Sequence, residues 1–147
     1  MAGDDELHAA ATEKLAERQQ RYTANRRTIV TALAAQPSPL TLPELLEAAP
    51  DLSQSSTYRN LAALEEAEVV RRIVSLGEHA HYELAEHLTE HHHHLVCNAC
   101  GAIEDVTLDG ALEQQLDEAF AAAARSRGFE PAGHSIDIEG RCADCRA

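Results

Sequence analysis

The chain has 147 residues, with 12 Lys and Arg against 25 Asp and Glu, and a formal net charge of −13. This length allows one ordinary domain or two small ones, and the acidic balance excludes a generally basic coat, so any DNA contact must come from a local patch. No run of about 18 apolar residues occurs, so we expect no membrane-spanning helix. Aromatic residues make up only 3%, and a small core built from Leu, Val, Ile and Ala favours support from metal or dimerisation.

The first half of the chain has the pattern of consecutive helices. Residues 1–6 are expected to be loose, and apolar residues at helical spacing predict a helix over 8–20. A second helix is predicted from Thr23, a suitable cap residue, to the proline-rich break at 36–39. The core-facing residues of these two helices are predicted to be Leu7, Ala11, Leu15, Ile29, Val30 and Leu33.

Two shorter helices and a hairpin follow. Thr41 and Glu44 form a capping-box pattern that predicts a helix through Ala49. Either Ser53 or Ser55 caps the next helix, whose inward residues are predicted to be Leu61, Leu64 and Val69. Strands are then predicted over 69–74 and 79–84, around a turn at 75–78. Three helices followed by this hairpin predict a winged helix-turn-helix over roughly residues 10–84.

The candidate DNA-binding residues lie mainly at the polar front of the fourth helix. Hydroxyl groups there can donate to phosphate, and a guanidinium can reach guanine in the major groove. The other interpretation is a capped, solvated turn. Up to residue 84 the net charge is −5, against −8 beyond it, so the first half is the less hostile to DNA. The candidates are Ser56, Thr57, Tyr58, Arg59, Arg26 and Arg71.

The second half is predicted to be a separate α/β unit. Residues 85–90 are a short polar connection, which places a hinge between a domain at 1–84 and a domain at 91–147. Strands are predicted over 92–96 and 102–107, then a helix over 109–127 that stops at Gly128, then a strand near 134–139. The inward face of that helix is predicted to carry Leu116 and Phe120.

Four cysteines occur as two C-x-x-C pairs, Cys97 with Cys100 and Cys142 with Cys145. Their thiolates can close a tetrahedral zinc site that ties the first and last strands of the second unit together. A redox dithiol is the alternative, but it predicts one pair at the start of a helix rather than two pairs. Paired cysteines without an apolar leader segment favour a reduced, cytoplasmic protein.

The histidine run at 91–94 leads directly into the cysteines, and its internal position argues against an expression tag. In a strand, alternate side chains point to opposite faces, so one run can serve two metal sites. His92 and His94 could join Glu83 and either Asp105 or Glu104.

The other two histidines of the run, His91 and His93, could meet His134 and Glu113. His134 could also be a hydrogen-bonded core histidine. Imidazole with carboxylate suits Zn²⁺, Fe²⁺, Mn²⁺ or Ni²⁺. The remaining histidines, His8, His79, His81 and His87, are expected at the surface.

Together, several motifs resemble the ferric uptake regulator family. They are Ser56-Thr57-Tyr58-Arg59-Asn60-Leu61, Tyr82-Glu83-Leu84, the histidine run into Cys97-x-x-Cys100-Gly101, Gly133-His134-Ser135 and the final C-x-x-C. The resemblance covers nearly the whole chain and implies an α+β protein with an N-terminal winged-helix DNA-binding domain and a C-terminal α/β dimerisation domain. It implies a homodimeric, metal-responsive repressor of metal-uptake or oxidative-stress genes that binds a palindromic DNA operator and is not an enzyme.

The resemblance also assigns the metal ligands. It implies a regulatory metal at Glu83, His92, His94 and Asp105, a second metal at His91, His93, Glu113 and His134, and structural zinc at the four cysteines. The regulatory ion is left open among Fe²⁺, Zn²⁺, Mn²⁺ and Ni²⁺, with peroxide sensing through bound iron as a further option.

Several positions depart from the family pattern. Ser38-Pro39 stands where many members have a ligand histidine, which His79 or His81 could replace. The connection from Glu83 to His91 is longer than usual, and His93 stands where aspartate is common. Leu112 beside Glu113 leaves the register of that acid open by one residue. The cysteine that zinc-sensing members often supply near the end of the wing is absent.

Two other classes of function fit part of the pattern. A zinc-dependent hydrolase would use a histidine cluster with glutamate as general base, but it predicts an H-E-x-x-H motif, which is absent. A zinc-containing protein-interaction module would bind no DNA. Steeply salt-dependent DNA binding separates both from a regulator.

Overall fold

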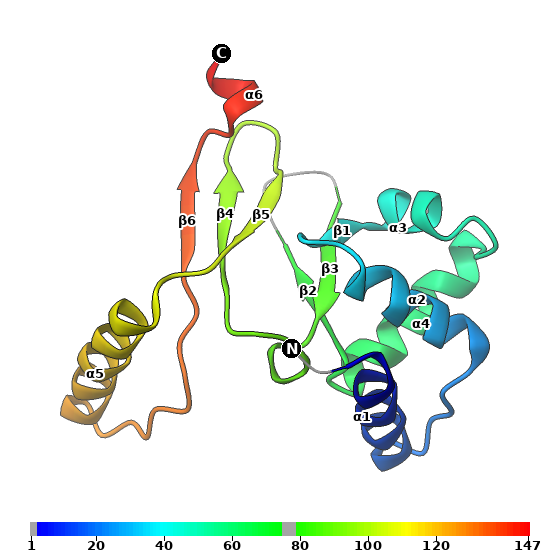
Figure 1. Ribbon diagram of the computed structural model, residues 1–147, viewed down its shortest axis with the longest axis horizontal. Coiled ribbons are helices and arrows are strands. Elements are labelled where there is room, and N and C mark those ends of the chain that lie inside the picture. Colours follow the sequence, from blue (N-terminus) through cyan, green and yellow to red (C-terminus); the bar gives the residue numbers. More distant parts are fainter. Residues whose placement is uncertain (1–2, 75–78) are drawn as a thin grey trace.

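The computed structural model describes residues 3–74 and 79–147, which form two groups of elements, each around its own three-stranded sheet (Figure 1). The first group consists of α1 (Asp4–Glu17), α2 (Ala24–Ala34), β1 (Leu40–Thr41), α3 (Leu42–Ala48), α4 (Gln54–Glu66), β2 (Val70–Ile73) and β3 (His81–Leu84). After the short 3-10 helix η1 (Glu86–Leu88), the second group consists of β4 (His93–Cys97), β5 (Ile103–Val106), α5 (Gly110–Ser126), β6 (Asp137–Gly140) and α6 (Ala143–Arg146). No helix in these ranges is long and apolar enough to cross a membrane.

The helix starts follow the predicted caps. The hydroxyl of Thr23 accepts from the backbone N–H of Arg26, and Thr41 and Glu44 form the capping box of α3. Ser53 caps α4, which decides between the two candidate serines.

The prediction of a loose segment over residues 1–6 was wrong for residues 4–6, because α1 already begins at Asp4; residues 1–2 lie outside the described residues. Its first turn carries Asp4, Asp5 and Glu6, whose charges favour the positive end of the helix dipole. The buried Leu7 then anchors this turn to the core. The helix ends at Glu17 rather than near Gln20, and Gln19 takes a left-handed backbone conformation with φ 58°.

One apolar core holds the first group together. It includes every predicted inward residue of α1, α2 and α4 and extends from Leu7 to Leu88. His8 was expected at the surface, but it is buried beside this core, with Nδ1 hydrogen-bonded to the Tyr22 hydroxyl at 2.5 Å. Burial raises the pKa of Tyr22 to about 12, so the phenol keeps its proton. The hydrogen bond satisfies the polar atom that burial of His8 takes out of water.

The predicted wing is an antiparallel pair, β2 with β3, in which Arg71 lies opposite Glu83. The predicted turn at 75–78 lies outside the described residues. An unpredicted two-residue strand, β1, adds to the other edge of β3, giving the order β1-β3-β2. His81 was expected at the surface, but it is buried in the central strand of this sheet.

The second sheet has the order β5-β4-β6, so the histidine strand β4 is central. β5 runs antiparallel to it and places Asp105 opposite His94. β6 runs parallel to it, pairing His94 with Asp137 and Cys97 with Gly140. The central strand therefore receives side chains from an acid-bearing strand on one side and from the last strand on the other.

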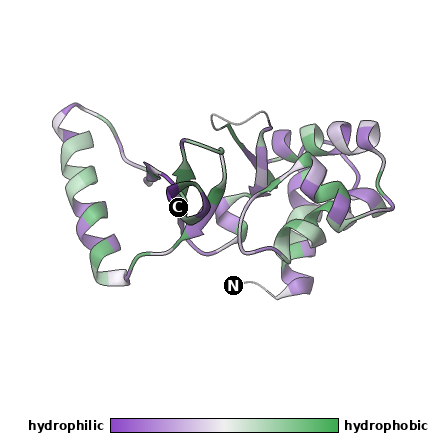
Figure 2. Ribbon diagram, turned by 90° about the horizontal axis from the view of Figure 1, so that it is seen from above, coloured by the Kyte–Doolittle hydropathy of each residue, from purple (hydrophilic) through white to green (hydrophobic). Residues whose placement is uncertain are grey.

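Helix α5 stands apart from both sheets (Figures 1 and 2). None of its side chains is buried, and Leu112 and Phe120 are 40% and 42% exposed. Phe120 was expected on the inward face of this helix, and its ring does contact the His134 ring, with centroids 5.2 Å apart, but within one chain that face is only partly covered. The predicted stop is present, with Gly128 at φ 79° after the last turn.

Candidate metal centres

The four cysteine thiols converge at one end of the second sheet. β4 ends at Cys97, and β6 leads into α6 with Cys142 as its N-cap residue. All four Sγ atoms lie within 4.8 Å of one another, and those of Cys100 and Cys142 are 3.8 Å apart. A tetrahedral zinc with Zn–S bonds of about 2.3 Å has S–S edges of about 3.8 Å. The thiols therefore fit a tetrahedral Zn²⁺.

Electrostatics at the thiols also favours a cation. The backbone N–H groups of Cys142, Cys100 and Ala99 lower the pKa of Cys97 to about 6. Hydrogen bonds with the other thiols, Cys142 first, raise the pKa of Cys145 to about 12. Four adjacent thiolates repel one another, and a bound divalent cation removes this penalty.

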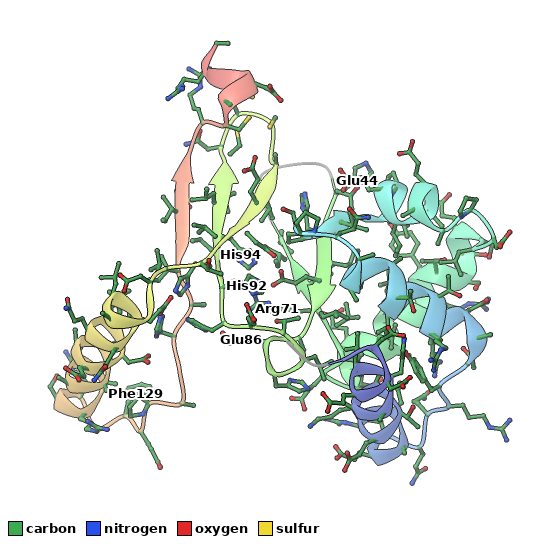
Figure 3. All side chains as sticks on the ribbon, viewed as in Figure 1. Glu44, Arg71, Glu86, His92, His94 and Phe129 are labelled. Atoms are coloured by element: carbon green, nitrogen blue, oxygen red, sulfur yellow. The ribbon has the colours of Figure 1, made fainter. Side chains whose placement is uncertain are left out.

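A second cluster lies between the two groups of elements (Figure 3). Glu83 comes from the end of β3, while His92, His94 and Asp105 come from the second sheet and the segment before it. His92 Nε2 is 3.0 Å from Glu83 Oε2, and His94 Nε2 is 3.1 Å from Glu83 Oε1. The Asp105 oxygens lie 3.7 and 3.6 Å from the same two nitrogens. We call this cluster the interdomain site.

The sequence left Asp105 and Glu104 as alternatives for this cluster. The donor atoms of Glu83, His92, His94 and Asp105 lie within 4.8 Å of one another, while the pleat of β5 places Glu104 on the opposite face. Asp105 Oδ1 is buried without a hydrogen-bond partner in the described chain. A buried carboxylate oxygen without a donor, beside two imidazole nitrogens, fits a site for a divalent cation.

The outer nitrogens of both histidines are held by the protein. His92 Nδ1 is 2.9 Å from the Glu90 carbonyl oxygen, and His94 Nδ1 is 3.4 Å from Asp137 Oδ1. These contacts turn both Nε2 atoms toward the shared carboxylates, the arrangement that outer hydrogen bonds give to metal-binding histidines. Asp137 was not predicted, since only the parallel pairing of β6 brings it to His94.

Without metal, the acidic and basic side chains of the interdomain site shift one another's pKa values in opposite directions. Burial alone would raise the pKa of Glu83, but hydrogen bonds with His94, Arg71 and His92 lower it to about 2. Burial alone would lower the pKa of His92 and His94, but the Glu90 carbonyl at His92 and the Glu83 carboxylate at both raise it. A proton therefore competes more strongly than usual for the imidazole nitrogens that a metal would need.

Acidification is therefore expected to weaken metal binding at the interdomain site. Each histidine must be neutral to bind an ion, so two protons leave on binding. Below the raised pKa values, affinity is expected to fall by up to about 100-fold per pH unit. Competition with a chelator of known affinity between about pH 5 and about pH 8.5 measures this. An affinity that does not change across that range would contradict the expectation.

The same pKa shifts set how stability without metal depends on pH. The raised histidines contribute stability that is full below about pH 6.5 and lost as the pH rises through their folded-state pKa. Glu83 contributes stability that is present above its ordinary pKa of 4.5 and lost as the pH falls toward about 2. Without metal, the interdomain site therefore stabilises the fold most between about pH 4.5, the ordinary pKa of Glu83, and about pH 6.5, the ordinary pKa of histidine.

A third cluster lies on the opposite side of β4, and we call it the C-terminal site. It consists of His91, His93, Glu113 and His134, with all donor atoms within 4.8 Å. The three Nε2 atoms lie 3.3, 2.6 and 3.1 Å from the Glu113 oxygens, in that order. The Glu113 carboxylate lies among these three imidazoles, while its neighbour Leu112 is exposed. Convergence of three imidazoles on one carboxylate fits a cation-binding site.

Two acids at the C-terminal site were missed by the sequence analysis. His134 Nδ1 is 2.7 Å from Asp117 Oδ1, and His91 Nδ1 contacts Glu86. Asp117 lies one helical turn after Glu113, a spacing that could have indicated it. Glu86 lies in the connection between the two groups, where the sequence gave no signal for it.

The structure changes the account of two predicted DNA-binding residues on α4 and β2. Thr57 has no exposed surface, so the prediction of a phosphate contact from it is wrong, because it faces the core side of α4. Arg71 forms an ion pair with Glu83, with Nε 3.1 Å from Oε1 (Figure 3). A DNA contact from Arg71 would require it to leave the interdomain site.

The other predicted DNA-binding residues remain at or near the surface. Tyr58 is 50% exposed, Arg59 is exposed and Ser56 is partly exposed. Arg26 hydrogen-bonds Asn60 and Gln20, which ties the start of α2 to α4. The exposed front of α4 therefore presents Tyr58 and Arg59 in particular.

Comparison with known proteins identifies the family to which a chain with these three clusters belongs. The model of the ferric uptake regulator family matches residues 17–139. The chain belongs to this family. The predicted fold class, with an N-terminal DNA-binding domain and a C-terminal dimerisation domain, is thereby confirmed. So is the prediction of a metal-responsive transcription regulator that is not an enzyme, which rules out the hydrolase.

Curated relatives include both iron and peroxide regulators. The chain is 36% identical over 104 residues to the ferric uptake regulation protein of Campylobacter jejuni, covering 69% of this chain and 62% of that protein. It is 30% identical over 139 residues to the peroxide operon regulator of Bacillus subtilis, covering 92% and 90%.

Solved structures of the family share the fold. The Helicobacter pylori ferric uptake regulator aligns with a TM-score of 0.74 at 20% identity, covering 99% of this chain and 95% of that one. The Vibrio cholerae ferric uptake regulator aligns with a TM-score of 0.66 at 27% identity, covering 89% and 98%. Regulators of this family are dimeric DNA-binding proteins.

Proposed function

We propose that this chain is a homodimeric, cytoplasmic repressor whose binding to a palindromic operator is controlled by metal at the interdomain site. The observation that carries this proposal is the origin of the ligands. Glu83 belongs to the sheet of the DNA-binding unit, whereas His92, His94 and Asp105 belong to the other unit. An ion held by all four would fix the angle between residues 1–84 and 91–147 across the hinge at 85–90.

The exposed surfaces support the dimer and its mode of DNA binding. α5 leaves Leu112 and Phe120 40% and 42% exposed, although the Phe120 ring contacts His134, and this exposed apolar face fits a symmetric interface between two copies. Each copy would then present the front of α4, with Ser56, Tyr58 and Arg59, to one half-site. A two-fold dimer places two such helices in successive major grooves of a palindrome.

The donor set restricts the metals. Two imidazoles and two carboxylates suit Fe²⁺, Mn²⁺, Zn²⁺ or Ni²⁺ at the interdomain site, whereas four thiolates suit structural Zn²⁺. Related regulators have been solved with iron from Francisella tularensis and with manganese from Pseudomonas aeruginosa. The Helicobacter pylori structure is described as revealing three functional metal-binding sites, and residues 3–74 and 79–147 of this chain also contain three such clusters. Genes of metal uptake or oxidative stress are the proposed targets.

Selection from a random double-stranded DNA library with the Mn²⁺-loaded dimer tests the function. We expect recovery of a palindrome, and affinity for it that falls steeply with salt, since each neutralised phosphate adds about 0.9 to the slope of log K against log salt concentration. The same selection after chelation at the interdomain site is the control and should recover no sequence. Enrichment of the same sequence with and without metal, or a shallow salt slope, would contradict the proposal.

A further inference from the structure

The C-terminal site has one contact with a residue outside the second unit, which contains all four of its candidate ligands. His91 Nδ1 contacts the carboxylate of Glu86, the first residue of η1, while His91 Nε2 lies 3.3 Å from Glu113. Glu86 therefore stands behind His91 relative to the point where the donor atoms converge. Figure 3 shows Glu86 in the loop that joins the two units, on the path between β3 and β4.

The geometry repeats a pattern found at the neighbouring histidines. His134 Nδ1 is hydrogen-bonded to Asp117, and His94 Nδ1 lies beside Asp137, so the outer nitrogen of each of these histidines contacts a carboxylate. An outer carboxylate fixes the ring orientation and raises the basicity of a metal-binding imidazole. Asp117 lies on α5 and Asp137 on β6, both in the second unit, whereas Glu86 alone of these three acids lies in the connection.

We propose that Glu86 is the positioning residue for His91 at the C-terminal site and that it couples occupancy of that site to the hinge. His91 lies before β4 begins and its side chain is 36% exposed, and its ring packs only edge-on against the rings of His93 and His134. The Glu86 carboxylate adds a hydrogen-bonding contact to its outer nitrogen, which fixes the rotation of the ring. In turn, a cation held by His91, His93, Glu113 and His134 fixes His91, and through it the first turn of η1. Metal at the C-terminal site would thus stiffen residues 85–90, the same hinge whose angle metal at the interdomain site would fix.

This inference rests on the proposed metal sites but not on metal-controlled DNA binding, so it is tested without DNA. The starting protein is the full-length dimer with its structural zinc and with the His92→Ala and His94→Ala substitutions, which remove the interdomain site. Zn²⁺ binding beyond the cysteine site then reports on the C-terminal site. Affinity is measured by competition with a chelator, and hinge mobility by amide hydrogen exchange of residues 84–90.

Glu86→Ala is expected to lower Zn²⁺ affinity by about 10- to 100-fold. In the parent, Zn²⁺ should slow amide exchange at residues 84–90. In the Glu86→Ala variant this slowing should be absent even at saturating Zn²⁺. Glu86→Gln keeps an oxygen that can accept from Nδ1–H, so it should restore part of both effects. Asp117→Ala is the matched control, because it removes the same kind of contact from His134. It should lower affinity similarly yet keep the slowing at saturation.

Three results would overturn the inference. Affinity of the Glu86→Ala variant within twofold of the parent would remove the positioning role. Slowing of hinge exchange that persists in that variant, or equal loss in the Asp117→Ala variant, would remove the coupling. Absence of Zn²⁺ binding beyond the cysteine site in the parent would overturn both. None of these results bears on whether the wild-type dimer binds DNA in response to metal at the interdomain site.

Discussion

Replacing Cys97 and Cys100 by serine is expected to unfold the second sheet and dissociate the dimer while leaving the DNA-binding unit folded. The second unit has almost no apolar core of its own, since the buried core cluster extends only from Leu7 to Leu88. Every residue of β6 is exposed, and α5 buries none of its side chains. We therefore expect this unit to depend on zinc binding by four thiolates, worth about 10–16 kcal/mol in small zinc modules, in addition to the proposed dimer interface.

Analytical ultracentrifugation and circular dichroism measure this outcome. We expect a monomer that has lost the strand signal of the second sheet but retains the helical signal of α1 to α4. Asn98→Ser is the matched control, since Asn98 is exposed between the two cysteines of the turn and contributes no ligand. A dimer with unchanged thermal unfolding after the double cysteine substitution would show that zinc is dispensable for the fold.

Replacing His92 and His94 together by alanine is expected to remove the metal dependence of operator binding. Without these nitrogens, the interdomain site retains only the carboxylates of Glu83 and Asp105. The Arg71 guanidinium then holds the Glu83 carboxylate with no imidazole or metal competing for it. If metal raises operator affinity about 100-fold, the variant loses about 2.7 kcal/mol of coupling free energy. Fluorescence anisotropy with a labelled operator, with and without Mn²⁺ at one salt concentration, gives both affinities.

His87→Ala provides the comparison for that experiment. His87 is an exposed histidine of η1, and no metal-spaced cluster in the described chain contains it. This variant should keep the full metal response. An unchanged response in the double His92/His94 variant would place the metal switch at another site.

Most of the fold could be predicted from local sequence patterns. The caps at Thr23 and Thr41 and the apolar spacing of Ile29, Val30 and Leu33 depend on neighbours a few residues away, so they are visible in the sequence. β1 could not be predicted, because its two residues are extended only through pairing with β3. The burial of His8 depends on Tyr22, which lies in the connection between α1 and α2 and folds back onto α1.

The candidate sites show the same division. Strand geometry explains why His93 and His94 point to opposite faces, while His91 and His92 lie in the segment before β4 and continue the same alternation; both clusters contain the predicted ligand residues. Their supporting contacts, such as Asp137 at His94, depend on the parallel pairing of β6, which no spacing reveals. The ion pair of Arg71 was missed because it depends on the register of the β2–β3 pair.

The place of β6 in the second sheet has a consequence for the order in which the protein matures during translation. A nascent chain synthesised only through α5 already contains the whole apolar core of the DNA-binding unit, from Leu7 to Leu88. It lacks two of the four cysteines, His134 of the C-terminal site and Asp137, which orients His94. The DNA-binding unit can therefore fold on the ribosome before the cysteine site and the C-terminal site are complete.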